Sequence, residues 1–128
     1  MKTFVYLLAE QAINKAVEIA PDTASFHKDL GNLLQEHLKR YEEAEAAYRK
    51  AIELGPQYAN AYSGLADLLN KTERAGEALE PAILGVCYGP DYEFARYIFL
   101  EVCRDSLDPW LKVLPETMNY LKENPEND

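Results

Sequence analysis

The segment 41–56 constrains the fold of this chain most strongly, because it specifies a helix with small residues along one face. Its apolar residues recur at separations of three and four, which places most of them on one side of a helix. These residues are Ala44, Ala47, Tyr48, Ala51, Ile52 and Leu54. The alanines allow a neighbouring helix to approach closely, and Tyr48 fills the space beside them. Pro56 prevents the helix from continuing, and we expect Gly55 to end it in a left-handed conformation.

The same spacing of small residues and proline occurs three times in the chain. In the segment above, the set Ala44, Tyr48, Ala51 and Pro56 has separations of four, three and five residues. Matching sets start 35 residues earlier and 34 residues later, as Ala9, Ile13, Ala16 and Pro21 and as Ala78, Ala82, Gly85 and Pro90. A fixed period of about 34 residues with two helices per unit is typical of a stacked helical repeat.

Over residues 24–90 the chain resembles the tetratricopeptide repeat family. The opening 41–44, Tyr-Glu-Glu-Ala, is among the most recognisable stretches of that family. Its first-helix signature is present as Leu30-Gly31 with Leu34, and as Leu65-Ala66 with Leu69. The second repeat departs from the pattern, since Ala75-Gly76 replaces the acidic pair. The resemblance implies an all-α fold: a right-handed α-solenoid of antiparallel helix pairs, with about seven helices and a C-terminal capping helix.

We expect one domain over residues 1–128. Its parts are the second helix of a partial repeat (1–21), repeat one (24–58), repeat two (59–92), a degenerate repeat with capping helices (93–124) and an acidic tail (125–128). Helices are expected over residues 3–20, 22–38, 41–54, 57–70, 74–88 and 91–105. Asp108 followed by Pro109 predicts the start of a separate final helix. Pro81 and Pro115 are expected to bend the helices that contain them.

Composition excludes several classes of function. The net charge of −9 argues against a nucleic-acid surface, which needs clustered Lys and Arg. No apolar run approaches the ~20 residues of a membrane helix, so we expect no membrane insertion. Cys87 and Cys103 form no close pair and suit buried apolar positions, and we expect a cytoplasmic protein.

The sequence offers no catalytic constellation and no glycine-rich phosphate loop, so we expect neither enzymatic activity nor a cofactor. His27 and His37 lie ten residues apart on one expected helix, which separates them by about 15 Å. That distance is too long for both to bind one metal ion, and no metal site is expected.

The resemblance implies that the first helix of each repeat lines a concave groove. The candidate peptide-binding residues there are Lys28, Asn32, Gln35, Asn60, Ser63, Asp67, Asn70, Tyr97, Glu101 and Arg104. Further inner positions are Ser25, Asp29, Glu36, Gly64, Lys71, Phe94 and Ile98. A row of amides and hydroxyls suits hydrogen bonding to the backbone of an extended peptide, since one amide satisfies both a carbonyl and an N–H.

Some members of the family bind the C-terminal carboxylate of chaperone tails through lysine, asparagine and arginine residues spread over three repeats. Lys28 and Asn32 match the first pair of that set. Gly64 stands where a further asparagine is expected, and Phe94 and Ile98 stand where the basic pair is expected. Carboxylates in the same groove would repel an acidic tail. The resemblance therefore favours a different partner.

These patterns predict a non-catalytic protein–protein interaction module, a scaffold or adaptor that binds a peptide or protein partner in its groove. Two alternatives stay open. The chain could assemble into a homo-oligomer by stacking through exposed terminal helices. It could also be an auxiliary repeat domain of a larger enzyme.

Overall fold

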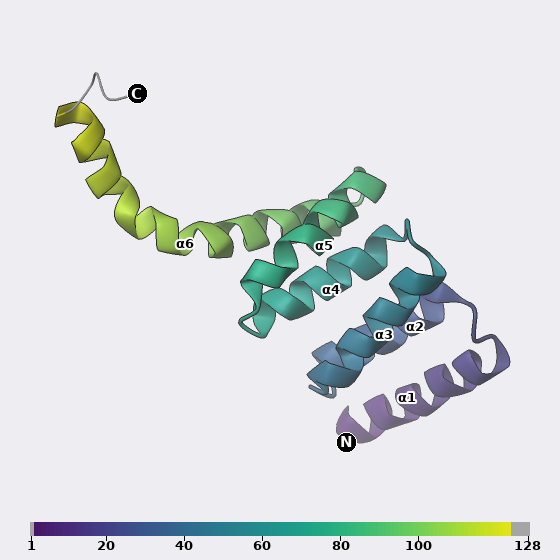
Figure 1. Ribbon diagram of the computed structural model, residues 1–128. Coiled ribbons are helices and arrows are strands. Elements are labelled where there is room, and N and C mark those ends of the chain that lie inside the picture. Colours follow the sequence, from purple (N-terminus) through teal and green to yellow (C-terminus); the bar gives the residue numbers. More distant parts are fainter. Residues whose placement is uncertain (1, 124–128) are drawn as a thin grey trace.

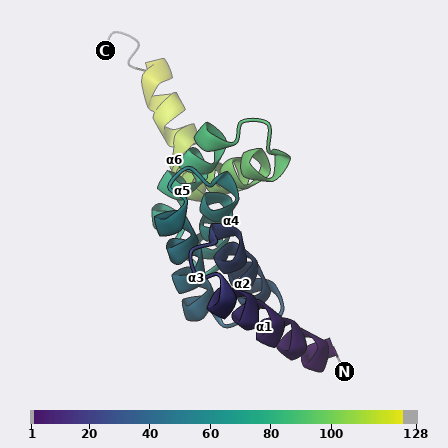
Figure 2. The same ribbon diagram turned by 90° about the vertical axis from the view of Figure 1, so that its right-hand side faces the viewer.

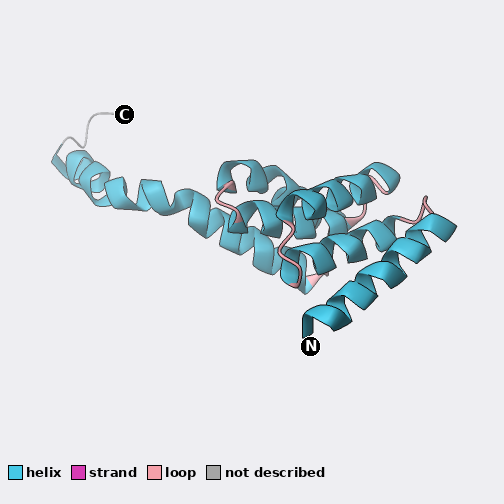
Figure 3. Ribbon diagram, turned by 90° about the horizontal axis from the view of Figure 1, so that it is seen from below, coloured by secondary structure: helices cyan, strands magenta, loops and turns pink. Residues whose placement is uncertain are grey.

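The computed structural model describes the backbone of residues 2–123 and the side chains of residues 2–106 and 122–123. Every regular element in that part of the chain is an α-helix (Figure 3). The six helices are α1 (Lys2–Ile19), α2 (Ala24–Glu36), α3 (Tyr41–Leu54), α4 (Ala59–Lys71), α5 (Ala75–Tyr88) and α6 (Glu93–Glu123).

The helices form a stack of antiparallel pairs. α2 pairs with α3 and α4 pairs with α5, while α1 lies at one end of the stack and α6 at the other (Figures 1 and 2). α4 also packs on α6 and, less extensively, on α2, so the first helices of successive pairs form one layer. The expected all-α solenoid of antiparallel helix pairs is confirmed.

Two turns between paired helices adopt left-handed backbone at residues other than glycine. Lys39, between α2 and α3, has φ 56°, and Glu73, between α4 and α5, has φ 62°. The turns close with hydrogen bonds from the amide of Arg40 to the carbonyl of Leu34 at 2.9 Å and from Arg74 to Leu69 at 2.8 Å. The left-handed conformation expected at Gly55 is wrong, since its φ is −134°. Pro56 and the following turn suffice to end α3.

The two helices expected at the C-terminal end are one continuous helix in the structure. α6 has 31 residues and passes through Asp108, Pro109 and Pro115 without a break. A proline removes one backbone hydrogen bond and bends a helix, and a long helix can absorb that cost. Figure 1 shows α6 curving away from the stack along its second half. α5 likewise continues through Pro81.

The centre of the core is the ring of Tyr48, which lies between two glycines of neighbouring helices. A Cβ atom on Gly31 of α2 would lie 2.8 Å from the ring, and one on Gly64 of α4 would lie 2.5 Å from Cε1. Both distances are shorter than van der Waals contact, so only glycine leaves room for the ring. Tyr48 therefore passes from α3 between α2 and α4. The expected alanine face surrounds it, with Ala44 and Ala51 fully buried.

Candidate functional site

A cavity of about 200 Å³ opens on the layer formed by α2, α4 and the start of α6. α2 provides its residues at intervals of four, as Lys28, Asn32 and Glu36. The remaining lining residues are Tyr48, Asn60, Gly64, Asp67, Tyr92 and Phe94. We call this cavity, with its nine lining residues, the groove.

The floor of the groove is a hydrogen-bond network that begins at Tyr48. Its hydroxyl donates to Asn32 Oδ1 at 2.6 Å and shares that proton with Gln35 Oε1 at 2.9 Å. Gln35 Nε2 donates to Asp67 Oδ2 at 3.0 Å, and Lys71 Nζ donates to the same oxygen at 3.0 Å. Burial raises the pKa of the Tyr48 phenol far above its usual range, so the hydroxyl keeps its proton. The network joins α3, α2 and α4.

This network fixes the orientation of Asn32. Because the amide oxygen accepts the bond from Tyr48, its NH₂ group faces the open side and makes no side-chain hydrogen bond within the described residues. Asn60, on the opposite wall, makes no side-chain hydrogen bond in that part of the chain either. The groove thus presents two amides that are able to bind a peptide backbone.

Both lysines of the groove region are already paired with carboxylates. Lys28 Nζ lies 2.7 Å from Asp29 Oδ1, and Lys71 Nζ lies 3.0 Å from Asp67 Oδ2. Burial lowers the pKa of each lysine, but the hydrogen bond to its carboxylate and the charges of neighbouring groups together raise it, and the net direction is upward. Each lysine therefore stays charged and largely neutralises its partner.

The structure places the candidate peptide-binding residues in several different positions. Lys28, Asn32, Asn60 and Asp67 line the groove. Gln35 lies beneath it and is only 3% exposed.

The other candidates lie away from the groove. Ser63 is 1% exposed and packs against α5, where a Cβ on Gly85 would lie 2.5 Å from its Oγ. Ser63 is therefore not available to a ligand. Asn70 donates to Asp105 Oδ2 at 2.8 Å and joins α4 to α6.

Three candidates on α6 form a separate surface group. The Tyr97 hydroxyl donates to Glu101 Oε1 at 2.8 Å, and Arg104 Nη2 lies 3.8 Å from the same oxygen. Tyr97 and Arg104 are exposed, and none of the three lines the groove. They lie farther along α6 than Phe94, which does line it.

Sequence reasoning missed two lining groups. Tyr92 precedes α6 and had no repeat position to indicate it. Tyr48 was assigned to the core as a whole. Its ring is indeed buried, but its hydroxyl oxygen reaches the groove. A signal for the second was present, since each of the two first helices beside Tyr48 contains a glycine, Gly31 in one and Gly64 in the other.

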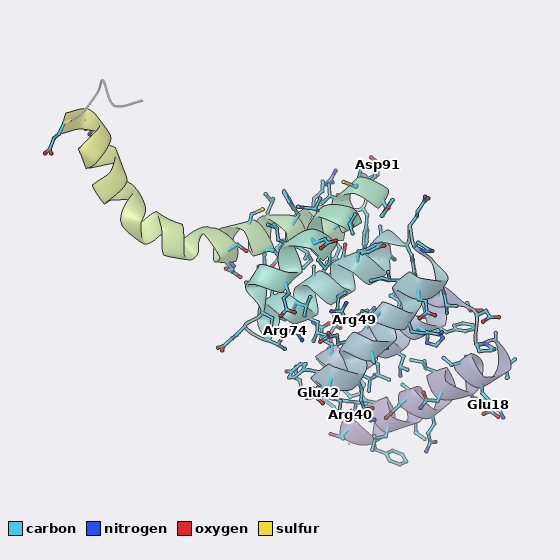
Figure 4. The ribbon with its side chains drawn as sticks, viewed as in Figure 1. Glu18, Arg40, Glu42, Arg49, Arg74 and Asp91 are labelled. Carbon is cyan, nitrogen blue, oxygen red and sulfur yellow. The ribbon has the colours of Figure 1, made fainter. Side chains whose placement is uncertain are left out.

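Ion pairs tie the outer helices together. Glu45 of α3 accepts from Arg74 Nη1 at 2.5 Å and from Arg49 Nε at 3.0 Å, and Figure 4 shows both arginines between α3 and α5. The Arg74 hydrogen bond lowers the pKa of Glu45. Arg40 joins α1 to the stack by binding both oxygens of Glu10, at 2.7 and 2.9 Å.

A second hollow of about 380 Å³ lies on the opposite side, between α3, α4 and α5. Its lining combines apolar side chains with charged ones. The lining residues are Arg49, Ile52, Tyr62, Leu65, Glu77, Glu80, Pro81 and Leu84.

The described residues contain no group of three or more metal-ligating side chains. His27 is buried and its Nε2 lies 2.9 Å from the carbonyl oxygen of Pro21, while His37 stacks on Tyr6 with 4.0 Å between ring centroids. None of the helices, as far as the structure describes them, is long and apolar enough to cross a membrane. Both cysteines are free, and the burial expected for Cys87 is wrong because it is exposed.

Comparisons with known proteins agree with this architecture. A family model described as TPR repeat matches residues 38–72, which include all of α3 and α4. The TPR2B domain of yeast Sti1, solved in a complex with pHsp70, superposes with a TM-score of 0.71 over 77% of this chain and 83% of that chain, at 20% identity. Residues 38–72 of this chain therefore match a tetratricopeptide repeat, and the rest of the described chain shares the fold of such repeats.

Two further solved structures show the range of proteins that share the fold. The TPR domain of Arabidopsis OM64 gives a TM-score of 0.72 at 16% identity, over 80% of this chain and 84% of that chain. An O-GlcNAc transferase mutant from Thermobaculum terrenum gives 0.71 at 24% identity, over 79% of this chain but 19% of that chain. No curated protein matches the chain.

Proposed function

We propose that this chain is a protein-interaction module that binds an extended peptide segment in the groove and performs no chemistry of its own. The observation that carries the proposal is the pair of amides on opposite walls of the groove, Asn32 and Asn60, which have unused hydrogen-bonding groups. An extended peptide presents alternating N–H and C=O groups that such amides bind. The complex of the similar Sti1 domain with pHsp70 supports the same kind of function.

The partner is not an acidic C-terminal tail held by the basic and amide set of the family. A side chain at position 64 would collide with the Tyr48 ring, since even a Cβ would lie 2.5 Å from it. Ile98, at a position where that set needs a cation, is only 2% exposed and belongs to the core. The groove could not acquire the missing groups without repacking around Tyr48.

The test is binding of peptides selected from a random display library, measured against variants of the groove. Asn60→Ala removes an amide with no side-chain hydrogen-bond partner in the described chain, so the stability of the protein should change little. The affinity for the peptide should fall about 10-fold, because one or two hydrogen bonds to the ligand are lost. Asn14→Ala is the matched control, because Asn14 is exposed on α1, away from the groove. Equal affinities of the parent and Asn60→Ala for every selected peptide would contradict the proposal.

A second candidate function, self-association, is favoured by the outward face of α1. This helix has no buried residue, and its exposed apolar side chains include Phe4, Val5, Leu8 and Ile19. Light scattering over a concentration series would decide the question, since a species that stays monomeric at high concentration excludes assembly. A role as auxiliary domain of a larger enzyme has its support in the Thermobaculum transferase, of which the part similar to this chain is 19%. A cytoplasmic location is consistent with two free cysteines.

A further inference from the structure

We propose that the groove selects a segment in which a basic side chain, Lys or Arg, lies three or four residues from an apolar one. The inference rests on the proposed function, because it assigns the chemistry of the ligand to the two ends of the same groove.

The charged end of the groove is Glu36. The cations nearest to the floor, Lys28 and Lys71, are committed to Asp29 and Asp67 at 2.7 and 3.0 Å. Glu36 lines the groove, is exposed, and forms no ion pair with any residue that the structure describes. It is therefore the carboxylate that remains free to bind a cation brought by a ligand.

Two lysines of the chain lie near Glu36: Lys71, whose pKa the charge of Glu36 helps to raise, and Lys39, which can compete with a ligand for Glu36. Lys39 lines a small adjoining cavity together with Glu36, Gln35, Tyr41 and Lys71, and it also has no ion-pair partner in the described part. Lys39 lies in the turn after α2 and has left-handed backbone, with φ 56°. Its Cα–Cβ bond therefore points in a different direction from those of the residues in α2. Removal of Lys39 should strengthen the binding of a basic ligand, which provides a control of opposite sign.

The apolar end of the groove is the pair Tyr92 and Phe94. Their ring centroids lie 5.8 Å apart at an interplanar angle of 56°, and both rings are half-buried. They line the wall at the start of α6, at the end of the groove where Lys28 and Asn60 lie near the starts of α2 and α4. These two tilted rings can bind an aliphatic or aromatic side chain of the ligand, while the amide of Asn60 beside them hydrogen-bonds to the ligand backbone.

The spacing follows from the length of α2 between the two ends. Lys28 and Glu36 are eight residues apart, which corresponds to about 12 Å of helix rise. An extended segment advances about 3.3 Å per residue, so three to four residues span the same distance. Asn32, halfway along, faces the backbone of the segment between its two side-chain contacts.

The experiment is selection from phage-displayed random 12-residue peptides on the full chain and three variants. Asn60→Ala reports whether a peptide occupies the groove, and Glu36→Lys reverses the charge that the inference invokes. Lys39→Asn removes the competing cation with a residue that tolerates positive φ. Glu36 and Lys39 are exposed, so melting temperatures should match the parent, and circular dichroism checks this.

Peptides selected on the parent should carry Lys or Arg at the stated distance from an apolar residue. Their affinity should fall at least 10-fold on Glu36→Lys and rise on Lys39→Asn, and selection on Glu36→Lys should favour Asp or Glu at the same position. Peptides that need Asn60 but are indifferent to Glu36→Lys would overturn this inference and leave the proposed function intact. Absence of any peptide that is sensitive to Asn60→Ala would overturn both.

Discussion

Substitution of Gly64 by alanine tests whether the Tyr48 ring is fixed between two helices. The added Cβ would lie 2.5, 2.9 and 3.1 Å from Cε1, Cζ and Cδ1 of the ring. Gly31 of α2 lies on the other side of the ring, so close that a Cβ added there would also be only 2.8 Å from it, and this leaves the ring little room to retreat towards α2. Relief therefore requires α4 to move away from α2, or the hydroxyl to leave Asn32 and Gln35.

Two terms of opposite sign determine the size of the effect. Alanine is favoured over glycine within a helix by about 1 kcal/mol. Overpacking of a filled core costs about 1–3 kcal/mol, and a contact against an immobile ring belongs at the upper end of that range. We expect Gly64→Ala to lower the free energy of unfolding by about 2 kcal/mol after the helix gain is included.

Urea denaturation followed by circular dichroism measures this change, with Gly76→Ala as the matched control. Gly76 also lies in a helix, but no atom lies within 4 Å of its added Cβ, so that variant should be as stable as the parent or more stable. In a Tyr48→Leu background the cost of Gly64→Ala should shrink by more than 1 kcal/mol, since contacting residues are not additive. Parental stability of Gly64→Ala, or strict additivity with Tyr48→Leu, would refute the reasoning.

Two further predictions concern the hydrogen-bond network and one ion pair. Tyr48→Phe removes the donor to Asn32 and Gln35 and should cost about 1–2 kcal/mol in urea denaturation, because Gln35 Oε1 stays buried without a donor. Glu45→Gln should cost about 0.5–1 kcal/mol at pH 7. Because Arg74 lowers the folded-state pKa of Glu45, this stabilisation is present above its ordinary value of 4.5 and is lost as the pH falls through the lowered value. Thermal melts of both proteins between pH 7 and pH 3 should therefore converge at the acidic end, and a constant difference would exclude the mechanism.

The position of α3 could be predicted from sequence because several local signals coincide there. An alanine stripe, an acidic first turn and a terminal proline all indicate residues 41–54, and the structure has the same helix. The ends of other elements depend on tertiary packing. Lys39 and Glu73 adopt left-handed backbone although neither is glycine, because the closure of each helix pair imposes the turn. Nothing in the residue types at these two positions indicates it.

The groove was predictable as a surface but not residue by residue. A helix turns about 100° per residue, so neighbours in sequence face different elements. Gly64 faces Tyr48 whereas Ser63 faces Gly85, and family position alone did not separate them. Asp108 and Pro109 illustrate the same limit for helix boundaries, because a strong local start signal lies inside a continuous helix.

The Tyr48 ring has a consequence for the shape of the ligand-binding surface. In the next repeat the equivalent position is Ala82, which is buried, so the two joints of the stack contain side chains of very different thickness. α2 and α4 are held apart by an aromatic spacer, whereas α4 and α6 pack more closely. The width of the groove is thus set at one joint by one residue. The size of the side chain at position 48 therefore affects which ligands fit in two ways, through the spacing of α2 and α4 and through its own place in the lining of the groove.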